Sequence, residues 1–249
     1  MSGHSKWATI KHKKGAADAK RGRLFTKLIR EITVAARMGG GDINANPRLR
    51  KAVSDAKAQQ MPAYTIQRAI KRGTGELDGA SYEEVLYEGT GPGGILLLIE
   101  VVTDNRNRTV AELRKIFEKH NGSLGSSGTA AWAFDRKGVF QVDGATDEGK
   151  LMDVAVGAGA DDYENTGEVW QVVTPVELFD TVAKALEADG ITVLESGLEF
   201  LPKSKKSLVG RDAEVALNLT DALDDHDDVQ NVFADLDVSD EEMARISGE

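Results

Sequence analysis

Apolar residues recur at helical spacing along the first third of the chain. Between residues 16 and 38 they lie three or four positions apart, which predicts an amphipathic helix that ends at three consecutive glycines. An asparagine–proline pair predicts the start of a second helix over residues 47–61, and a third follows over residues 62–73. Because such helices cannot bury their apolar faces singly, we expect a three-helix bundle over residues 1–78.

The spacing becomes strand-like after residue 79. Two strands, over residues 84–88 and 94–103, flank a glycine-rich hairpin. A helix over residues 106–120 follows, and residues 131–134 are expected to form a third strand.

The next stretch carries a complete motif. Its order is strand, helix, strand, strand, helix, strand, which is the ferredoxin-like order. The expected elements are residues 139–142, 147–156, 162–165, 169–173, 176–188 and 192–195.

A helix over residues 213–223 and a strand over residues 229–235 have no partners of their own. The piece that begins near residue 82 lacks one helix and one strand, so we expect the two pieces to complete each other. The predicted fold class is α+β, with an N-terminal three-helix bundle and two α+β domains, one of them ferredoxin-like and inserted into the other. The expected domains are residues 1–78, residues 79–135 with 207–249, and residues 136–206.

Charge is segregated along the chain. Residues 1–73 hold 17 Lys+Arg against 4 Asp+Glu, a balance of +13, whereas residues 74–249 carry −23 within a total of −10. Such asymmetry is typical of a protein in which one face meets a polyanion.

The basic arm at the N-terminus combines cations with one large aromatic ring. Lysine and arginine bind phosphate, and tryptophan can stack on a base, so the arm is a candidate nucleic-acid interface. The alternative is a solvated basic terminus whose tryptophan packs beneath the first helix. The candidate residues in this arm are His4, Ser5, Lys6, Trp7, Lys11, Lys13, Lys14, Lys20, Arg21, Arg23 and Lys27.

A second candidate lies in the acidic part of the chain. Residues 103–109 form a polar turn between a strand and a helix, and Arg106 and Arg108 could contact phosphate or an RNA backbone there. The alternative is that Asn105 or Asp104 simply caps the helix.

Three stretches of the chain resemble the YebC/PmpR family of cytoplasmic regulatory proteins. They are the opening Ser2-Gly3-His4-Ser5-Lys6-Trp7 with the lysines after it, Tyr87-Glu88-Gly89 with Gly91-Pro92-Gly93-Gly94, and Thr103-Asp104-Asn105-Arg106-Asn107-Arg108-Thr109. The resemblance implies a three-domain architecture and control of gene expression. Members are generally described as probable transcriptional regulators, and translation-factor roles are also attributed to them.

Enzymatic chemistry has no candidate in the sequence. Residues 89–94 satisfy a dinucleotide-binding pattern, but a strand rather than a helix follows them. Residues 144–150 approach a P-loop, but Leu151 stands where a magnesium-binding hydroxyl is needed, and Asp147 and Glu148 would repel phosphate. Both acids suit the first turn of an ordinary helix. We therefore predict a non-enzymatic protein without a cofactor.

Metal and membrane sites are also not expected. The four histidines are scattered and the chain has no cysteine, so no zinc site is predicted. The acidic run over residues 224–228 could bind magnesium or calcium weakly, but a solvated acidic turn is favoured. The longest aliphatic run, residues 95–99, is too short to span a membrane, so a cytoplasmic protein is expected.

Together these features predict a nucleic-acid-binding regulator of gene expression. A DNA-binding transcriptional regulator is ranked first, with promoter DNA as the partner. A translation factor associated with the ribosome or ribosomal RNA is the alternative. A monomer is favoured.

Overall fold

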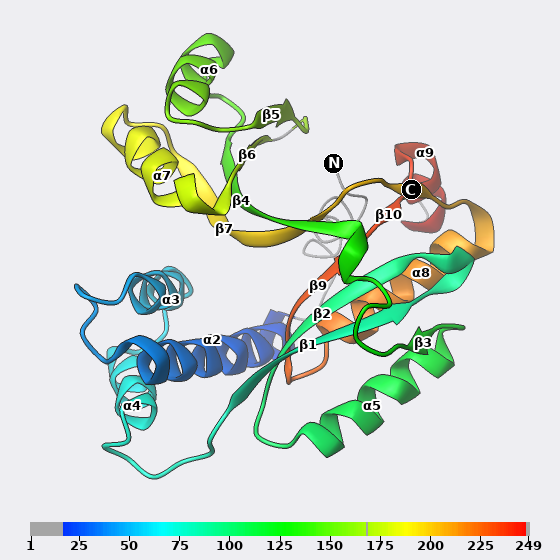
Figure 1. Ribbon diagram of the computed structural model, residues 1–249, viewed down its shortest axis with the longest axis horizontal. Helices are drawn as coiled ribbons and strands as arrows, with labels where there is room; N and C mark the ends of the chain where they lie inside the picture. Colours follow the sequence, from blue (N-terminus) through cyan, green and yellow to red (C-terminus); the bar gives the residue numbers. More distant parts are fainter. Residues whose placement is uncertain (1–16, 168, 248–249) are drawn as a thin grey trace. The chain divides into compact units, whose positions relative to one another are not determined.

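The computed structural model describes residues 17–167 and 169–247 (Figure 1). The chain mixes helices with antiparallel sheets, as predicted, and begins with a helical region. It forms two compact units, residues 132–205 and the described remainder on either side of them. Within the described part, no helix is both long enough and apolar enough to cross a membrane.

The N-terminal region contains α2 (Ala17–Gly39), α3 (Pro47–Ala58) and α4 (Ala63–Gly73). Asn46 caps α3 by accepting a hydrogen bond from the Leu49 amide at 3.1 Å. The buried amide group of Asn46 also donates to the carbonyl oxygens of Ala35 and Gly40, at 2.8 and 2.9 Å. The predicted helix start is confirmed, and one side chain fixes both the beginning of α3 and its position beside α2.

Helices α2 and α4 approach each other closely at Gly73. A Cβ atom on this residue would lie 2.3 Å from the Thr33 carbonyl oxygen and 2.7 Å from the Cβ of Ala36. The core beside this contact is apolar, with Ile32, Leu49 and Ile66 buried between the three helices. The predicted bundle therefore depends on a position without a side chain.

The middle sheet has the strand order β3-β1-β2-β9, with antiparallel neighbours throughout. The strands are β1 (Glu83–Thr90), β2 (Leu96–Thr103), β3 (Ser123–Leu124) and β9 (Val229–Ala234). The late strand β9 pairs with β2, so it belongs to the middle sheet, which the sequence predicted it would complete.

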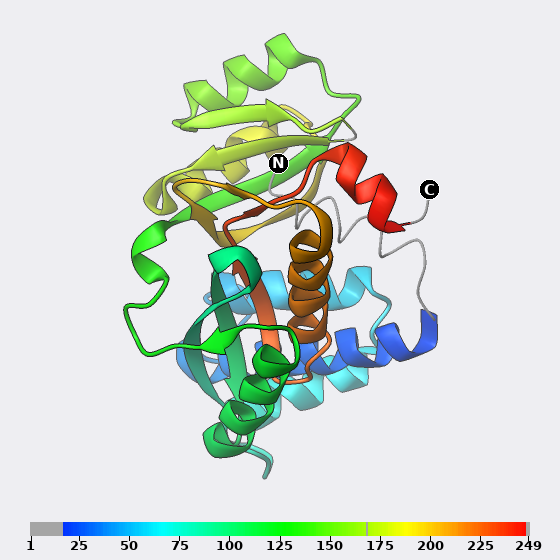
Figure 2. The same ribbon diagram turned by 90° about the vertical axis from the view of Figure 1, so that its right-hand side faces the viewer.

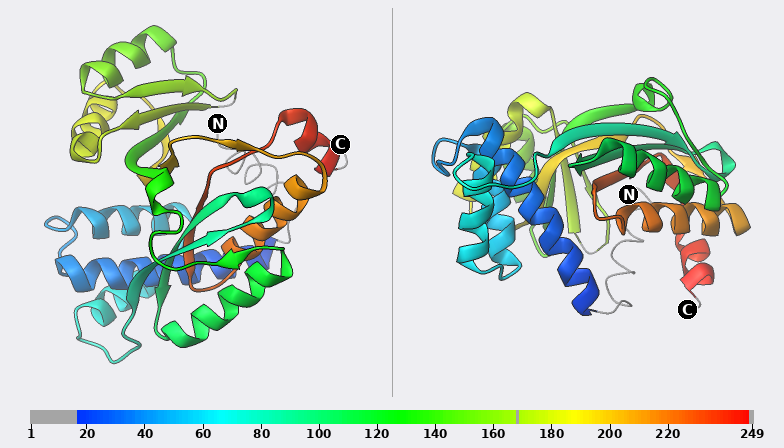
Figure 3. Two further views of the ribbon diagram at one scale, coloured as in Figure 1. Left: turned by 45° about the vertical axis from the view of Figure 1, so that its right-hand side comes forward. Right: turned by 90° about the horizontal axis from the view of Figure 1, so that it is seen from below.

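Two helices cover one face of this sheet. Figure 3 shows α5 (Arg106–Lys119) and α8 (Gly210–Asp224) together on that face. Their apolar residues join the alternate residues of β2 in one core, with Phe117 and Leu217 packed near Leu97 and Ile99. The segment at residues 210–234 thus supplies the helix and strand that the earlier piece lacks.

The glycine-rich connection between β1 and β2 is a tight turn, and a strand follows it, as expected. A 3₁₀ turn, η1 (Pro92–Gly94), contains two glycines with positive φ, 64° at Gly93 and 75° at Gly94. Because β2 rather than a helix follows, no helix N-terminus is available for a dinucleotide phosphate.

The third strand of the middle sheet is not where the sequence placed it. The predicted strand over residues 131–134 is wrong, because Ala131–Ala133 form a 3₁₀ turn, η2, and Phe134 opens the next sheet. The third strand is β3, in the glycine- and serine-rich stretch. A Cβ on Gly122 would lie 2.7 Å from the Thr90 carbonyl oxygen, so this glycine permits the close approach that β3 needs.

A buried carboxylate orders the loop after β3. Glu88 accepts hydrogen bonds from the backbone N–H groups of Gly128, Ala130 and Ala131, at 2.8, 2.6 and 2.8 Å. Burial acts to raise the pKa of Glu88, but these three donors outweigh it and the pKa lies below its ordinary value.

The unit of residues 132–205 has the ferredoxin-like topology. Its elements are β4 (Phe134–Asp143), α6 (Glu148–Gly157), β5 (Asp162–Asn165), β6 (Val169–Thr174), α7 (Phe179–Ala188) and β7 (Val193–Pro202). The sheet order is β5-β6-β4-β7, and every neighbouring pair is antiparallel. Phe140, Leu151, Trp170 and Leu186 belong to one core between the helices and the sheet.

The C-terminal region contains elements that the sequence pattern did not predict. The short strands β8 (Lys206–Ser207) and β10 (Leu236–Asp237) pair in parallel, and α9 (Asp240–Ser247) ends the described chain. Lys206 pairs through its backbone with Leu236 and donates from Nζ to the Gly94 carbonyl oxygen at 3.2 Å.

Replacing Gly73 by alanine should lower the free energy of unfolding by about 1 to 3 kcal/mol, because α2 and α4 must separate to admit the methyl group. Gly22→Ala is the matched control, since nothing lies within 4 Å of a Cβ at that position in α2. This control should be neutral or stabilising by up to about 1 kcal/mol. Chemical denaturation of both variants measures the difference, and equal stability would contradict the role assigned to Gly73.

Candidate nucleic-acid interface

Most of the predicted arm belongs to the part of the chain that the structure does not describe. His4, Ser5, Lys6, Trp7, Lys11, Lys13 and Lys14 lie outside the described residues. Lys20 and Arg21 belong to the beginning of α2, and their side chains are outside the description as well. Their assignment to nucleic-acid binding stays a prediction.

The next two predicted cations meet carboxylates of the same chain. Lys27 donates to the carboxylate and the carbonyl oxygen of Asp224, at 2.9 and 2.8 Å. Arg23 lies 3.5 Å from the carboxylate of Asp225. Figure 2 shows the end of α8, which carries these acids, beside α2. In this conformation both cations are already paired by the acidic turn of residues 224–228.

The centre of this contact is the side chain of Asp228, which is only 3% exposed. Arg30 on α2 and Arg108 on α5 each place a guanidinium nitrogen 2.8 Å from its carboxylate oxygens. The hydroxyls of Thr103 and Thr109 also lie within hydrogen-bonding distance of it. One carboxylate therefore joins the N-terminal helices, α5 and the end of β2.

Charge and hydrogen bonding keep this carboxylate ionised. Burial acts to raise the pKa of Asp228, but the Thr109 hydroxyl, the Arg108 guanidinium and the charge of Arg30 together hold it below its ordinary value. The hydrogen bond to Asp228 in turn raises the pKa of Arg108. The predicted phosphate contact Arg108 is therefore part of an internal ion-pair network.

The loop at residues 103–109 is organised as a helix cap. Asn105 accepts a hydrogen bond from the Arg108 amide at 3.1 Å and so caps α5, while contact of this loop with phosphate stays a prediction. Arg106 is more open, because its side chain is 56% exposed and lies 3.9 Å from Glu83. Of the two arginines predicted in this loop, Arg106 is the more accessible to a ligand.

A second arginine clamp joins the helices to the middle sheet. Arg48 on α3 binds both oxygens of Glu31 on α2, at 2.7 and 3.0 Å, and donates to Glu84 on β1 at 3.1 Å. Hydrogen bonds to Glu31 and then to Glu84 raise the pKa of Arg48 further above its usual range. The sequence analysis predicted no structural role for either Arg48 or Arg30.

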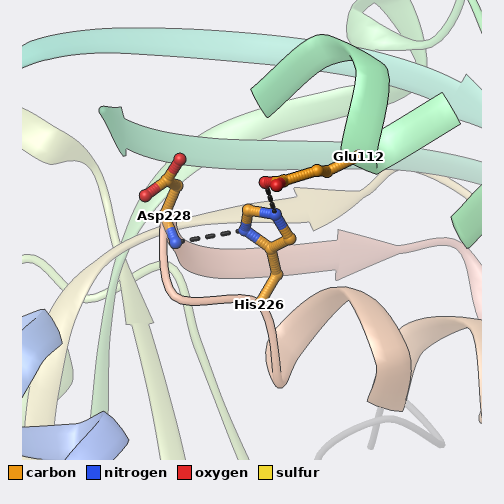
Figure 4. Close-up of side chains that lie close together, drawn as sticks. All are labelled: Glu112, His226 and Asp228. Carbon is orange, nitrogen blue, oxygen red and sulfur yellow. Dashed lines mark hydrogen bonds and ion pairs between the residues drawn. The ribbon is translucent and has the colours of Figure 1, made fainter. Parts of the chain in front are cut away.

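Glu112, His226 and Asp228 lie close enough together to suggest a cation site, and Figure 4 shows them. The Nδ1 atom of His226 accepts from the Asp228 backbone amide at 3.1 Å, which assigns the proton to Nε2, 2.9 Å from Glu112. Both ring nitrogens are thus engaged, and two guanidiniums already contact Asp228. This donor set fits an ion-pair network better than a divalent cation.

Four exposed cations on α3 and α4 have no ion-pair partner among the described residues. These exposed side chains recur at helical spacing on two helices, Arg50 and Lys57 on α3 and Arg68 and Lys71 on α4. The ring of Tyr64 on α4 is 74% exposed.

Comparison with known proteins gives matches along the chain. Residues 5–76 match the profile described as "TACO1/YebC protein N-terminal domain", and residues 82–236 match "TACO1/YebC second and third domain". A probable transcriptional regulatory protein of Geobacter sulfurreducens is 54% identical over 99% of this chain and 100% of its own. One of Desulforapulum autotrophicum is 53% identical over 97% of this chain and 98% of its own.

A solved structure has a similar fold. The crystal structure of a conserved hypothetical protein from Aquifex aeolicus aligns with a TM-score of 0.86 and 43% identity, and the alignment covers 94% of this chain and 98% of that one. Its architecture supports the arrangement of elements described above.

Asp228→Asn should destabilise the protein by about 3 kcal/mol at neutral pH, because Arg30 and Arg108 lose their shared negative charge in a buried position. The lower pKa of Asp228 in the folded chain means that its stabilisation is complete above the unfolded value of about 3.9 and is lost as the pH falls through the folded value. The difference between wild type and variant should therefore shrink in acid.

Denaturant titrations at several pH values measure this effect. Asp224→Asn is the control, because its side chain is 47% exposed and its ion pair with Lys27 is worth less than about 1 kcal/mol. An equal loss in the two variants at neutral pH would show that Asp228 has no special role.

Proposed function

The chain belongs to the TACO1/YebC family, and on that premise we propose that it regulates gene expression by binding nucleic acid through its N-terminal region, with promoter DNA as the first target. Relatives named as probable transcriptional regulatory proteins support a regulatory role. In this proposal the protein acts by binding and not by catalysis, and it needs no cofactor.

The observation that carries the proposal is the segregation of charge. Residues 1–73 carry +13 and residues 74–249 carry −23. A polyanion is attracted by the first part and repelled by the second, so the charge pattern orients the protein on nucleic acid without any sequence readout.

The described cations of the N-terminal region fall into a paired group and an unpaired group, and the unpaired group supports nucleic-acid binding by this region. Arg23, Lys27 and Arg30 hold the helices to the acidic turn, whereas the exposed cations on α3 and α4 are unpaired among the described residues. Exposed Tyr64 lies on the same stretch of α4 and offers a ring next to these charges. Cations together with an aromatic ring are what phosphate and base contacts require.

The open face of the ferredoxin-like sheet is unsuited to nucleic acid. Side chains alternate along β4, so Gln141 and Asp143 lie opposite the core residues Phe140 and Val142. Cross-strand pairing places further residues of β5, β6 and β7 on this open face. Its carboxylates are Asp135, Asp143, Asp162, Glu164, Glu195 and Glu199.

Lys137 is the single cation on the described strands of that face, and it pairs with Asp161 at 2.9 Å. The described strands also place no aromatic ring there. Contact with a polyanion is therefore assigned to the N-terminal region.

The proposed domains divide these tasks. Residues 1–78 would bind the nucleic acid, residues 79–135 with 207–249 would support them through the Asp228 and Arg48 contacts, and residues 136–206 would form the inserted acidic domain. We further propose that the protein acts as a monomer in the cytoplasm and not at a membrane.

A translation factor bound to ribosomal RNA is the second candidate. A basic arm with one tryptophan suits single-stranded or structured RNA, because unstacked bases are available to an aromatic ring. Crosslinking in cells followed by sequencing of both the bound DNA and the bound RNA decides between the two. Enrichment of promoter DNA supports the first candidate, and enrichment of ribosomal RNA supports the second.

Replacing Lys11, Lys13 and Lys14 by alanine should weaken binding to DNA and RNA of any sequence. The slope of log affinity against log salt should shrink by about two to three units, since each phosphate contact contributes roughly 0.7 to 0.9. Salt-titrated fluorescence anisotropy measures both quantities.

The matched control removes three charges from α5, as Arg114→Ala, Lys115→Ala and Lys119→Ala. These side chains are exposed and lie outside the N-terminal region. An equal loss in the control would place the binding surface elsewhere, and a wild-type protein that binds neither DNA nor RNA would refute the proposed function.

Replacing Trp7 by alanine tests the role of the ring. Loss of a stacking contact should cost roughly 1 to 3 kcal/mol of binding and leave the salt slope nearly unchanged, because no charge is removed. If the ring instead packs in the protein core, the variant should melt at a lower temperature at every salt concentration. Thermal melts beside anisotropy separate the two, and unchanged affinity in a folded variant excludes stacking.

A further inference from the structure

A small cleft lies where α2 and α4 end. Its volume is about 270 Å³, and it is lined by residues of both helices and by the segment of residues 75–82 that leads into β1. All of these residues belong to the same compact unit. Nothing in the sequence pattern marked this segment as a site.

Two guanidiniums line the cleft, one from each helix. Arg37 of α2 donates to the Ser81 hydroxyl at 3.0 Å, and the stem of Arg72 of α4 packs against Gly79, where a Cβ would lie 3.3 Å from Arg72 Cδ. Among the described residues, neither arginine has a carboxylate within ion-pair distance. They differ in this respect from Arg30 and Arg48, whose carboxylate partners hold the fold together.

Backbone donors in the same lining are also unused. The N–H groups of residues 78–81 make no hydrogen bond to any group of the described chain, although the preceding amides of Glu76 and Leu77 bond to the Lys71 carbonyl oxygen. An amide N–H that has no partner in the chain can donate to a phosphate oxygen. Side-chain and backbone donors therefore line one small space.

The charge of the cleft indicates what kind of anion it would take. Asp78 is the one carboxylate among the described lining residues, so two guanidiniums and one carboxylate leave a single positive charge. That charge matches the single negative charge of a phosphodiester, and guanidinium is the side-chain group whose geometry best fits phosphate oxygens.

We propose that this cleft is a phosphate-binding site, with Arg37 and Arg72 holding the phosphate between them and the amides of residues 78–81 completing the contact. Two sources can supply the phosphate, the backbone of a nucleic acid or a free nucleotide. Assignment to a nucleic-acid backbone rests on the proposed function, whereas affinity for phosphate itself does not.

The test uses the full-length chain labelled with ¹⁵N, at constant ionic strength. Inorganic phosphate, adenosine monophosphate and a 12-nucleotide single strand are titrated in separate arms, and the amide signals of residues 73–82 are followed. Saturable shifts of these signals are expected in wild type. In the variant Arg37→Gln/Arg72→Gln, the apparent affinity should fall by about tenfold or more, because charge-assisted hydrogen bonds are lost.

Arg114→Gln/Lys115→Gln is the matched control, since it also removes two exposed cations but lies on α5, outside the proposed nucleic-acid-binding surface. The control should keep the shifts at residues 73–82. If the double cleft variant does not fold, Arg37→Gln alone replaces it, because Arg37 is exposed and bonds only to Ser81 among described side chains.

The three titrations distinguish a failure of this phosphate site from a failure of the proposed function. Saturation by the oligonucleotide at a concentration tenfold lower than that of the mononucleotide assigns the site to a nucleic-acid backbone, and the reverse order assigns it to a free nucleotide. No saturable shift with any of the three ligands, or equal shifts in the cleft variant, overturns the site even if anisotropy shows nucleic-acid binding. Shifts with phosphate in a protein that fails to bind nucleic acid would support the site and refute the proposed function.

Discussion

The structure depends on one buried carboxylate that serves three elements at once. Asp228 receives Arg30 from α2 and Arg108 from α5, and the hydroxyls of Thr103 and Thr109 complete its surroundings. Arg108 also pairs with Asp104 at 2.9 Å, so a second carboxylate offsets the surplus of positive charge beside Asp228. The position of the N-terminal helices against the middle sheet is therefore set by electrostatics and hydrogen bonding as well as by apolar packing.

This network gives the charge segregation of the sequence a second meaning. Arg23, Lys27 and Arg30 lie along α2, and each meets a carboxylate 197 or more positions later in the chain. A basic region can thus be the internal partner of an acidic one and still carry other cations for an external polyanion. The family motif at residues 103–109 takes part in the internal contact, because Arg108, Thr103 and Thr109 hold Asp228 in place.

Local patterns predicted the elements well, because each depends on neighbours in sequence. The asparagine cap before α3 and the ferredoxin-like strand order are examples, and the return of α8 and β9 to the middle sheet was inferred from the pieces left without partners. The strand β3 was missed because its glycine and serine composition resembles a turn. Its pairing with β1 depends on the space that Gly122 leaves beside Thr90.

The candidate site was less accessible to sequence reasoning. The run at residues 224–228 was interpreted as a solvated acidic turn, yet Asp228 is almost fully buried, and its partner Arg108 lies 120 positions earlier. No local signal connects residues that far apart. The cleft at Arg37 and Arg72 was missed for a related reason. These two arginines differ from the others because no described carboxylate pairs with them, and only the folded structure shows where each carboxylate lies.

The late position of α8 and β9 has a consequence for how the protein is made. Leu97 and Ile99 of β2 belong to the core that Leu217 completes, so this part of the sheet has no full cover until residues beyond 210 have been synthesised. At roughly 5 to 20 residues per second, the 120 positions that separate Arg108 from Asp228 take about ten seconds to translate. The ferredoxin-like unit is continuous in sequence and can fold on the ribosome during that interval, before α8 and β9, the last helix and strand of the middle domain, have been synthesised.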